Sequence, residues 1–111
     1  LGYINSSSNI DVLTASVTGS GIESLIGFIA GNNAEEGFLI RGYCRPGDTV
    51  LSSSAGAGSL DVGTQVYADP TTPGGFTTVK PTTAGHCVRV VGHSLTSNTI
   101  FFNPSPDFIE L

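Results

Sequence analysis

The stretch HCVRVVGHSLTSNTIFFNPSPDFIEL, residues 86–111, carries the clearest strand pattern of the chain. Residues 86–95 are rich in valine and predict a strand, residues 96–98 predict a turn, and residues 99–103 predict a second strand. Strict alternation divides the first strand between two faces, with Cys87, Arg89, Val91 and His93 on one and Val88, Val90 and Gly92 on the other.

The last residues of this stretch combine prolines with large apolar side chains. Pro104 and Pro106 lack an N–H group, so we expect them to bar regular ladder pairing and to hold an extended tail. A small domain can bury only part of the apolar surface that follows, so we favour an arm lying along a neighbouring chain over a clasp that closes the domain's own sheet edge. The expected interface residues are Arg89, Phe101, Phe102, Pro104, Pro106, Phe108, Ile109 and Leu111.

Upstream of this stretch, short apolar runs alternate with Gly, Pro and Ser punctuation, which is typical of all-β proteins. The run at residues 25–30 fits a buried strand better than one helical turn, because Gly31 ends it early. The predicted fold is a small Gly-rich antiparallel barrel or sandwich of about seven or eight short strands. The remaining strands are expected at residues 9–18, 37–45, 49–53, 64–68 and 76–80, with turns at 46–48 and 69–75.

The composition favours contacts with other proteins. Only 12% of the 111 residues are charged, against about 25% in an average domain, so little charge has to be desolvated on assembly. The net charge of −5 excludes a nucleic-acid binder, which needs a basic surface. No apolar run approaches ~18 residues, so we expect no membrane insertion. Because the chain begins at Leu1 and contains no Met, we expect the C-terminal domain of a longer protein, with a processed product as the alternative.

Residues 37–111 resemble a module of virion structural proteins from tailed bacteriophages of cyanobacteria and marine bacteria. The resemblance lies in a Gly-x-x-Val-Tyr segment, a Gly-rich hairpin, the run Val-Arg-Val-Val-Gly and the run Ile-Phe-Phe-Asn-Pro-Ser-Pro. His93 and Cys87 depart from the pattern, where an aromatic and an apolar residue are common. The matching residues are Gly63, Val66, Tyr67, Pro81, Gly85, Val88, Arg89, Val90, Val91, Gly92, Ile100, Phe102, Asn103, Pro104 and Phe108.

The resemblance implies a structural role in the virion, as the terminal domain of a trimeric tail fibre or appendage. Its implied partners are copies of the chain, in a homotrimer, and other virion proteins; a capsid-decoration protein and a stand-alone carbohydrate-binding module are the alternatives. Host-surface glycan would meet the exposed loops at residues 52–58 and 69–75. Residues 1–36 would be an N-terminal segment that packs on or leads into the module at 37–111, in one domain overall.

No catalytic or metal-binding pattern emerges from the remaining residues. Serines are abundant, but the sequence around His93 lacks the second glycine of a nucleophile elbow, so we expect no enzyme and no cofactor. Zinc binding by His86, Cys87, His93 and Cys44 is disfavoured by their spacing. For Cys44 and Cys87, two buried thiols and a disulfide both remain open, and the reducing cytosol in which phages assemble favours the thiols.

Arg89 lies within an apolar run, where an arginine usually pairs with a carboxylate. We expect Asp107 or Glu110, of the same or an adjacent chain, to be its partner.

Overall fold

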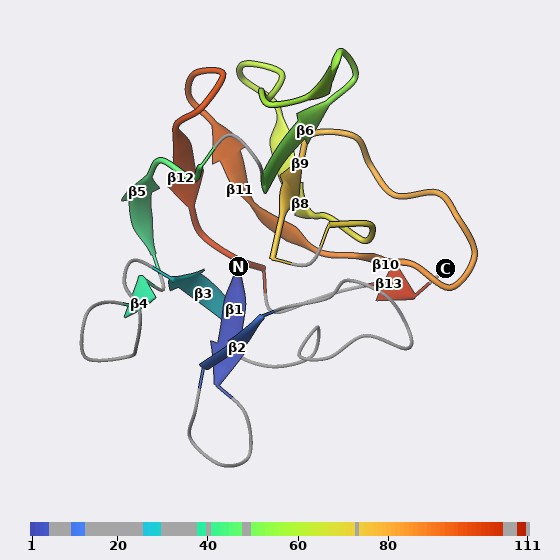
Figure 1. The fold of residues 1–111 in the computed structure, drawn as a ribbon, viewed down its shortest axis with the longest axis horizontal. Helices are drawn as coiled ribbons and strands as arrows, with labels where there is room; N and C mark the ends of the chain where they lie inside the picture. The colour runs from blue at the N-terminus through green and yellow to red at the C-terminus, as the bar shows by residue number, and fades with distance from the viewer. Residues whose placement is uncertain are drawn as a thin grey trace.

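The computed structural model of the protein is built from short strands (Figure 1). The structure describes residues 1–4, 10–12, 26–29, 38–39, 41–47, 50–72, 74–105 and 109–110, and these contain no α-helix. The strands are β1 (Gly2–Ile4), β2 (Ile10–Val12), β3 (Ile26–Ile29), β4 (Phe38–Leu39), β5 (Gly42–Cys44), β6 (Leu51–Ser53), β7 (Gly56–Ala57), β8 (Gln65–Ala68), β9 (Phe76–Thr77), β10 (Cys87–Val88), β11 (Val90–Ser94), β12 (Ile100–Phe102) and β13 (Ile109–Glu110).

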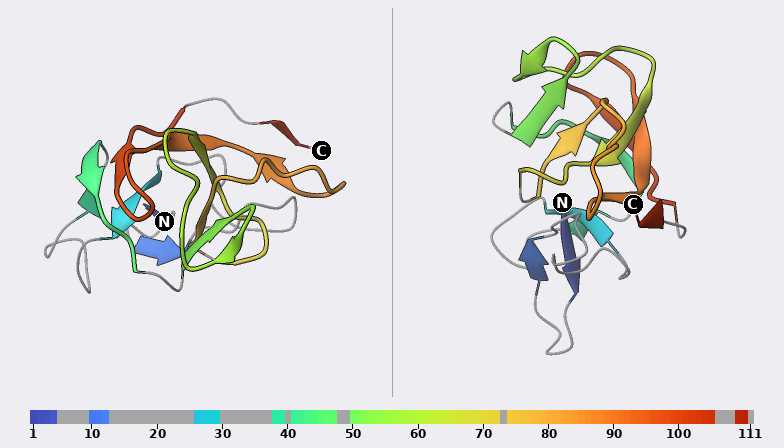
Figure 2. Two further views of the ribbon diagram at one scale, coloured as in Figure 1. Left: turned by 90° about the horizontal axis from the view of Figure 1, so that it is seen from above. Right: turned by 90° about the vertical axis from the view of Figure 1, so that its right-hand side faces the viewer.

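The largest sheet has seven strands in the order β5-β12-β11-β8-β9-β6-β7 and curls into an open half-barrel (Figures 1 and 2). The expected all-β fold is therefore confirmed. One pair departs from the expected antiparallel arrangement, because β6 runs parallel to β9. Two other strands, β7 and β8, lie between β6 and β9 in the sequence, so no local turn signal marks this pairing.

A second sheet, in the order β2-β1-β3-β4, lies beside the first in both figures and is antiparallel throughout. The expected boundary after residue 36 falls between β3 and β4, which pair with each other. The predicted strand at residues 37–45 is split in two, since β4 belongs to this sheet and β5 to the larger one. The buried side chain of Leu1 joins the core of the larger sheet.

The hairpin of β8 and β9 forms where the turn signals predicted it. The Asp69 amide donates to the Gly75 carbonyl at 3.0 Å and closes the loop. One carboxylate oxygen of Asp69 accepts the amides of Thr71 at 2.9 Å and Thr72 at 3.3 Å. Gly74 has a φ of 73°, in the left-handed region that glycine adopts without strain. Local side-chain chemistry therefore sets this hairpin.

Strand β11 carries a bulge that overturns the expected alternation of its faces. Its pairing with β8 shifts between Val90 and Gly92, so that Val91 is the extra residue. Val91 is fully buried whereas His93 is exposed, although alternation placed both on one face. The bulge turns one face of the strand towards the core and releases His93 to the solvent.

The core lies on the concave side of the larger sheet, and Phe76 and Phe102 pack edge to face within it, with ring centroids 6.4 Å apart. Phe102 was expected at an interface, but it is fully buried inside its own chain. Its burial contributes roughly 1.5–3 kcal/mol to folding. The core residues are Leu1, Cys44, Leu51, Leu60, Val66, Ala68, Phe76, Cys87, Val91, Ile100 and Phe102.

The segment after β12 continues along β11 despite its proline. The amides of Asn103 and Ser105 donate to the carbonyls of Val91 and Val90, each at 2.9 Å. Pro104 lies between these two donors, where no N–H is used, so it does not interrupt the contact. Regular ladder pairing nevertheless ends at Phe102, before this proline, as expected.

Candidate interaction site

The convex, outward face of the larger sheet presents a row of side chains across four neighbouring strands. In the strand registers Tyr43 of β5 lies opposite Phe101 of β12, Phe101 opposite His93 of β11, and His93 opposite Gln65 of β8. We call these four residues the outer row. Their alternation with buried neighbours, such as Cys44 beside Tyr43, directs them away from the core.

The aromatic end of the outer row combines one exposed ring, of Tyr43, with one half-buried ring, of Phe101. Tyr43 is 73% exposed, and its ring lies 5.5 Å from that of Phe101 at an angle of 54°. Such a tilted pair is a favourable aromatic geometry, so each ring holds the other in place. A tyrosine ring that faces the solvent and is held by a second ring is typical of a surface that binds another molecule.

Two arginines flank Tyr43 along the sheet edge. Arg41 and Arg45 are both exposed on either side of β5. They are half of the chain's four Lys and Arg residues, in a protein of net charge −5. The aromatic end of the outer row is therefore also cationic, and it combines the residue types that dominate binding energy at protein interfaces.

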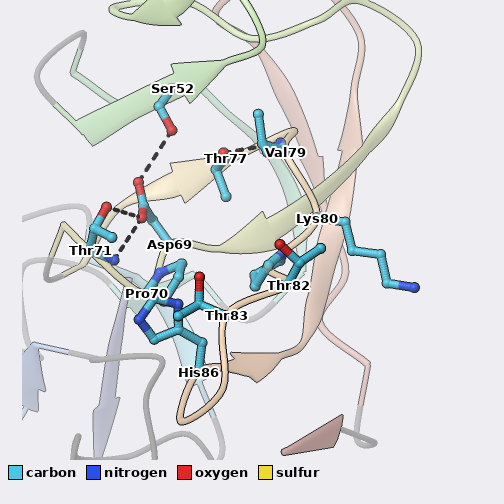
Figure 3. Close-up of a pocket in the computed structure, with 11 residues that line it drawn as sticks. Ser52, Asp69, Pro70, Thr71, Thr77, Val79, Lys80, Thr82, Thr83 and His86 are labelled. Carbon is cyan, nitrogen blue, oxygen red and sulfur yellow. Dashed lines mark hydrogen bonds between the residues drawn. The ribbon is translucent and has the colours of Figure 1, made fainter. Parts of the chain in front are cut away.

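Towards the other end of the same sheet, next to β6 and β9, the structure contains a cavity of about 250 Å³ (Figure 3). This volume is below the roughly 300–1,000 Å³ typical of small-molecule sites. The cavity is lined by Ser52, Asp69, Pro70, Thr71, Thr77, Val79, Lys80, Pro81, Thr82, Thr83 and His86.

The polar groups of this cavity stabilise the loops around it. The carboxylate of Asp69 accepts hydrogen bonds from the hydroxyls of Ser52 at 3.3 Å and Thr71 at 2.9 Å, besides the backbone bonds of its own turn. The bond to Ser52 joins the two loops that were expected to meet a glycan, at residues 52–58 and 69–75. The Lys80 side chain points away from the cavity in Figure 3. These contacts explain the loops' positions and provide no nucleophile held by a base.

Arg89 is buried, at 5% exposure, between β10 and β11. Its Nε donates to the Ser105 carbonyl at 2.9 Å, so the side chain fastens the segment after β12 to the sheet. Burial lowers the pKa of Arg89 from its ordinary value. Of the two carboxylates expected as partners, Asp107 lies outside the described residues and the side chain of Glu110 is not described, so that pairing stays a prediction.

The described end of the tail pairs with its own chain. Strand β13 is antiparallel to β10, with Ile109 opposite Val88 and Glu110 opposite Cys87. This is the clasp that was the less favoured alternative. Ile109 nevertheless exposes 61% of its side chain, and Pro104 is half-buried. The other expected interface residues, Pro106, Phe108 and Leu111, lie outside the described residues.

Both cysteines are buried, and they form no disulfide with each other. Burial raises the pKa of the Cys44 thiol to about 11. Within the described part of the chain, no three His, Cys, Asp or Glu residues lie close enough together to hold a metal ion, and no helix is long and apolar enough to cross a membrane.

Tyr43 is the functional candidate that sequence reasoning missed. Its signal was present in the run Arg-Gly-Tyr-Cys-Arg at residues 41–45, where an aromatic residue alternates with two arginines. The expected interface residues Phe101 and Arg89 do not lie together, since Phe101 belongs to the outer row, where it is half-buried, and Arg89 is buried between β10 and β11. Comparisons of this chain with protein-family models, curated proteins and solved structures found no match.

Proposed function

We propose that this protein is a structural component of a bacteriophage particle that works by assembling with copies of itself. The observation that carries the proposal is the aromatic pair of exposed Tyr43 and half-buried Phe101 on β5 and β12, where β5 is an edge strand among the described residues. A soluble domain with no partner gains nothing from ordered aromatic rings and an unprotected sheet edge in water. Self-assembly would bury both the aromatic rings and the sheet edge.

The low charge content and the resemblance of residues 37–111 to phage virion modules support the same proposal. Within a particle, we propose the terminal domain of a trimeric tail fibre or appendage. The loops around the cavity remain the proposed contact for a host-surface glycan, because their hydroxyl-rich lining suits a polyol.

Light scattering of the purified chain during size-exclusion chromatography tests the proposal. A homotrimer has three times the monomer mass of 11.4 kDa and should persist at micromolar concentration. A chain that remains monomeric across the accessible concentration range contradicts self-assembly and leaves the outer row to another class of partner. Glycan hydrolysis by the purified chain would contradict a purely structural role.

A further inference from the structure

The seven-stranded sheet ends in two edge strands of different character. Among the described residues, β5 forms one edge and β7 the other, and no strand pairs with the outer side of either. An open edge offers backbone N–H and C=O groups to any strand that can approach it. The side chains on each edge therefore determine which strand can pair with it.

The β5 edge resists pairing with its own copy. In a twofold dimer the two β5 strands would run antiparallel around Tyr43, so that Arg41 of each copy would lie opposite Arg45 of the other. Like charges directly opposite each other across strands are destabilising. The two arginines thus disfavour an isologous sheet centred on Tyr43 at this edge.

The β7 edge has the opposite properties. Both of its residues, Gly56 and Ala57, are exposed and carry no side chain larger than a methyl group. At the turn that leads into β7, the carboxylate of Asp61 accepts hydrogen bonds from the Ser54 hydroxyl at 3.0 Å and from the Thr78 hydroxyl, which follows β9, at 2.8 Å. These bonds lower the pKa of Asp61, so the group is charged at neutral pH.

The backbone N–H and C=O groups of Ala57 point out of the sheet at this edge. Ser53 and Gly56 flank the hairpin turn, and the Gly58 amide donates to the Leu51 carbonyl at 2.8 Å. In this antiparallel register the residue between those bonded positions, Ala57, directs its N–H and C=O away from β6. The outward side of β7 is therefore a small, uncharged strand edge, and the turn that leads into it holds the Asp61 carboxylate.

We propose that the β5 edge, with Arg41, Tyr43 and Arg45, docks on the β7 edge of a second copy of this chain. The contact joins two different surfaces, so it is head-to-tail, and copies joined in this way close into a ring or extend into a filament. Charge complementarity favours it, because the arginines of one copy approach Asp61 of the next. This inference rests on the proposed self-assembly and specifies the surfaces that assembly uses.

Single-residue variants of each edge test the inference by light scattering. Arg45→Glu places a carboxylate against Asp61, and Ala57→Arg places a cation against the arginines of β5. Each should weaken self-association about a hundredfold, because like charges at an interface are strongly unfavourable. The matched controls are Lys80→Glu and Ala84→Arg, which make the same charge changes at exposed positions away from both edges and should assemble like the parent chain.

Mixing the two variants gives the decisive result. Arg45→Glu retains an intact β7 edge and Ala57→Arg retains an intact β5 edge, so the mixture should associate although neither variant associates alone. Rescue also shows that both variants are folded. If the parent chain assembles but either edge variant assembles equally well, or the mixture stays monomeric, the head-to-tail contact is wrong while the proposed function stands. A monomeric parent chain overturns both.

Discussion

The Cα of Gly92 lies against the backbone carbonyl of Phe101, in the strand next to it. A Cβ built on Gly92 would overlap that carbonyl oxygen and would lie 3.2 Å from the Cγ2 of Ile100. Gly92 follows the bulge residue Val91, and both lie on the buried side of β11. The close approach of β11 and β12 therefore depends on the absence of a side chain at this position.

The variant Gly92→Ala should lower the free energy of unfolding by roughly 3 kcal/mol or more, because the new methyl group meets backbone that cannot rotate away. Urea denaturation followed by circular dichroism measures this. Gly47→Ala is the matched control, since a Cβ at Gly47 would have nothing within 4 Å. Equal stability of the two variants would contradict the close approach.

The sequence predicts the local features of this fold better than the pairing of distant strands. The hairpins were predictable because Asp69, Thr96 and the glycines near them form turns through contacts within a few residues, such as the Thr99 amide donating to the Thr96 hydroxyl at 3.1 Å. The bulge at Val91 and the parallel pair of β6 and β9 were not, because each depends on strands far apart in the sequence. Alternation alone therefore assigned His93 to the wrong face.

The candidate site was predictable only in part, for a related reason. Phe101 and Phe102 look alike in sequence, and only the register of β12 decides that one is at the surface and the other in the core. Tyr43 is a candidate because its ring packs against that of Phe101. Phe101 lies 58 residues away in the sequence and opposite Tyr43 in the register of β5 and β12. Composition indicated a surface for protein contacts but could not place it.

Ser94 connects the end of β11 to the loop before β8. It is 2% exposed, its hydroxyl donates to the Asp61 carbonyl, and it accepts the Thr64 amide at 3.2 Å. Ser94→Ala should destabilise the protein by about 1 kcal/mol, because it removes two part-buried hydrogen bonds to the backbone of Asp61 and Thr64. Thermal unfolding measures the loss, and Ser97→Ala, at an exposed turn position, should have little effect.

Asp61 should make stability depend on pH in the acid range. Hydrogen bonds from Thr78 and Ser54 lower its pKa below 3.8, so its contribution is present above that value and is lost as pH falls through the folded-state pKa. Asp61→Asn should therefore have a lower melting temperature than the parent chain at pH 7, and the difference should shrink towards pH 2. A difference that is constant over this range would show that the carboxylate charge contributes nothing.

Cys44 should be protected from thiol reagents while the protein is folded. Its side chain is 8% exposed, and burial raises its pKa to about 11, so almost none of it is thiolate at pH 8. A coloured disulfide reagent should label the native chain slowly and the urea-unfolded chain at once. The raised pKa also means that the thiol's contribution to stability is complete below pH 9 and is lost as pH rises through about 11.

The partner of Arg89 can be identified by a double-mutant cycle. Arg89→Ala should cost about 2 kcal/mol or more, because it removes a charged donor from the Ser105 carbonyl and leaves a gap between β10 and β11. If Asp107 or Glu110 pairs with the guanidinium, neutralising that carboxylate should cost less in Arg89→Ala than in the parent chain, by at least about 0.5 kcal/mol. Additive effects for both Asp107→Asn and Glu110→Gln would rule out a carboxylate partner within the chain's own tail. Because the Ser105 contact is independent of any carboxylate, the loss caused by Arg89→Ala alone should persist in either case.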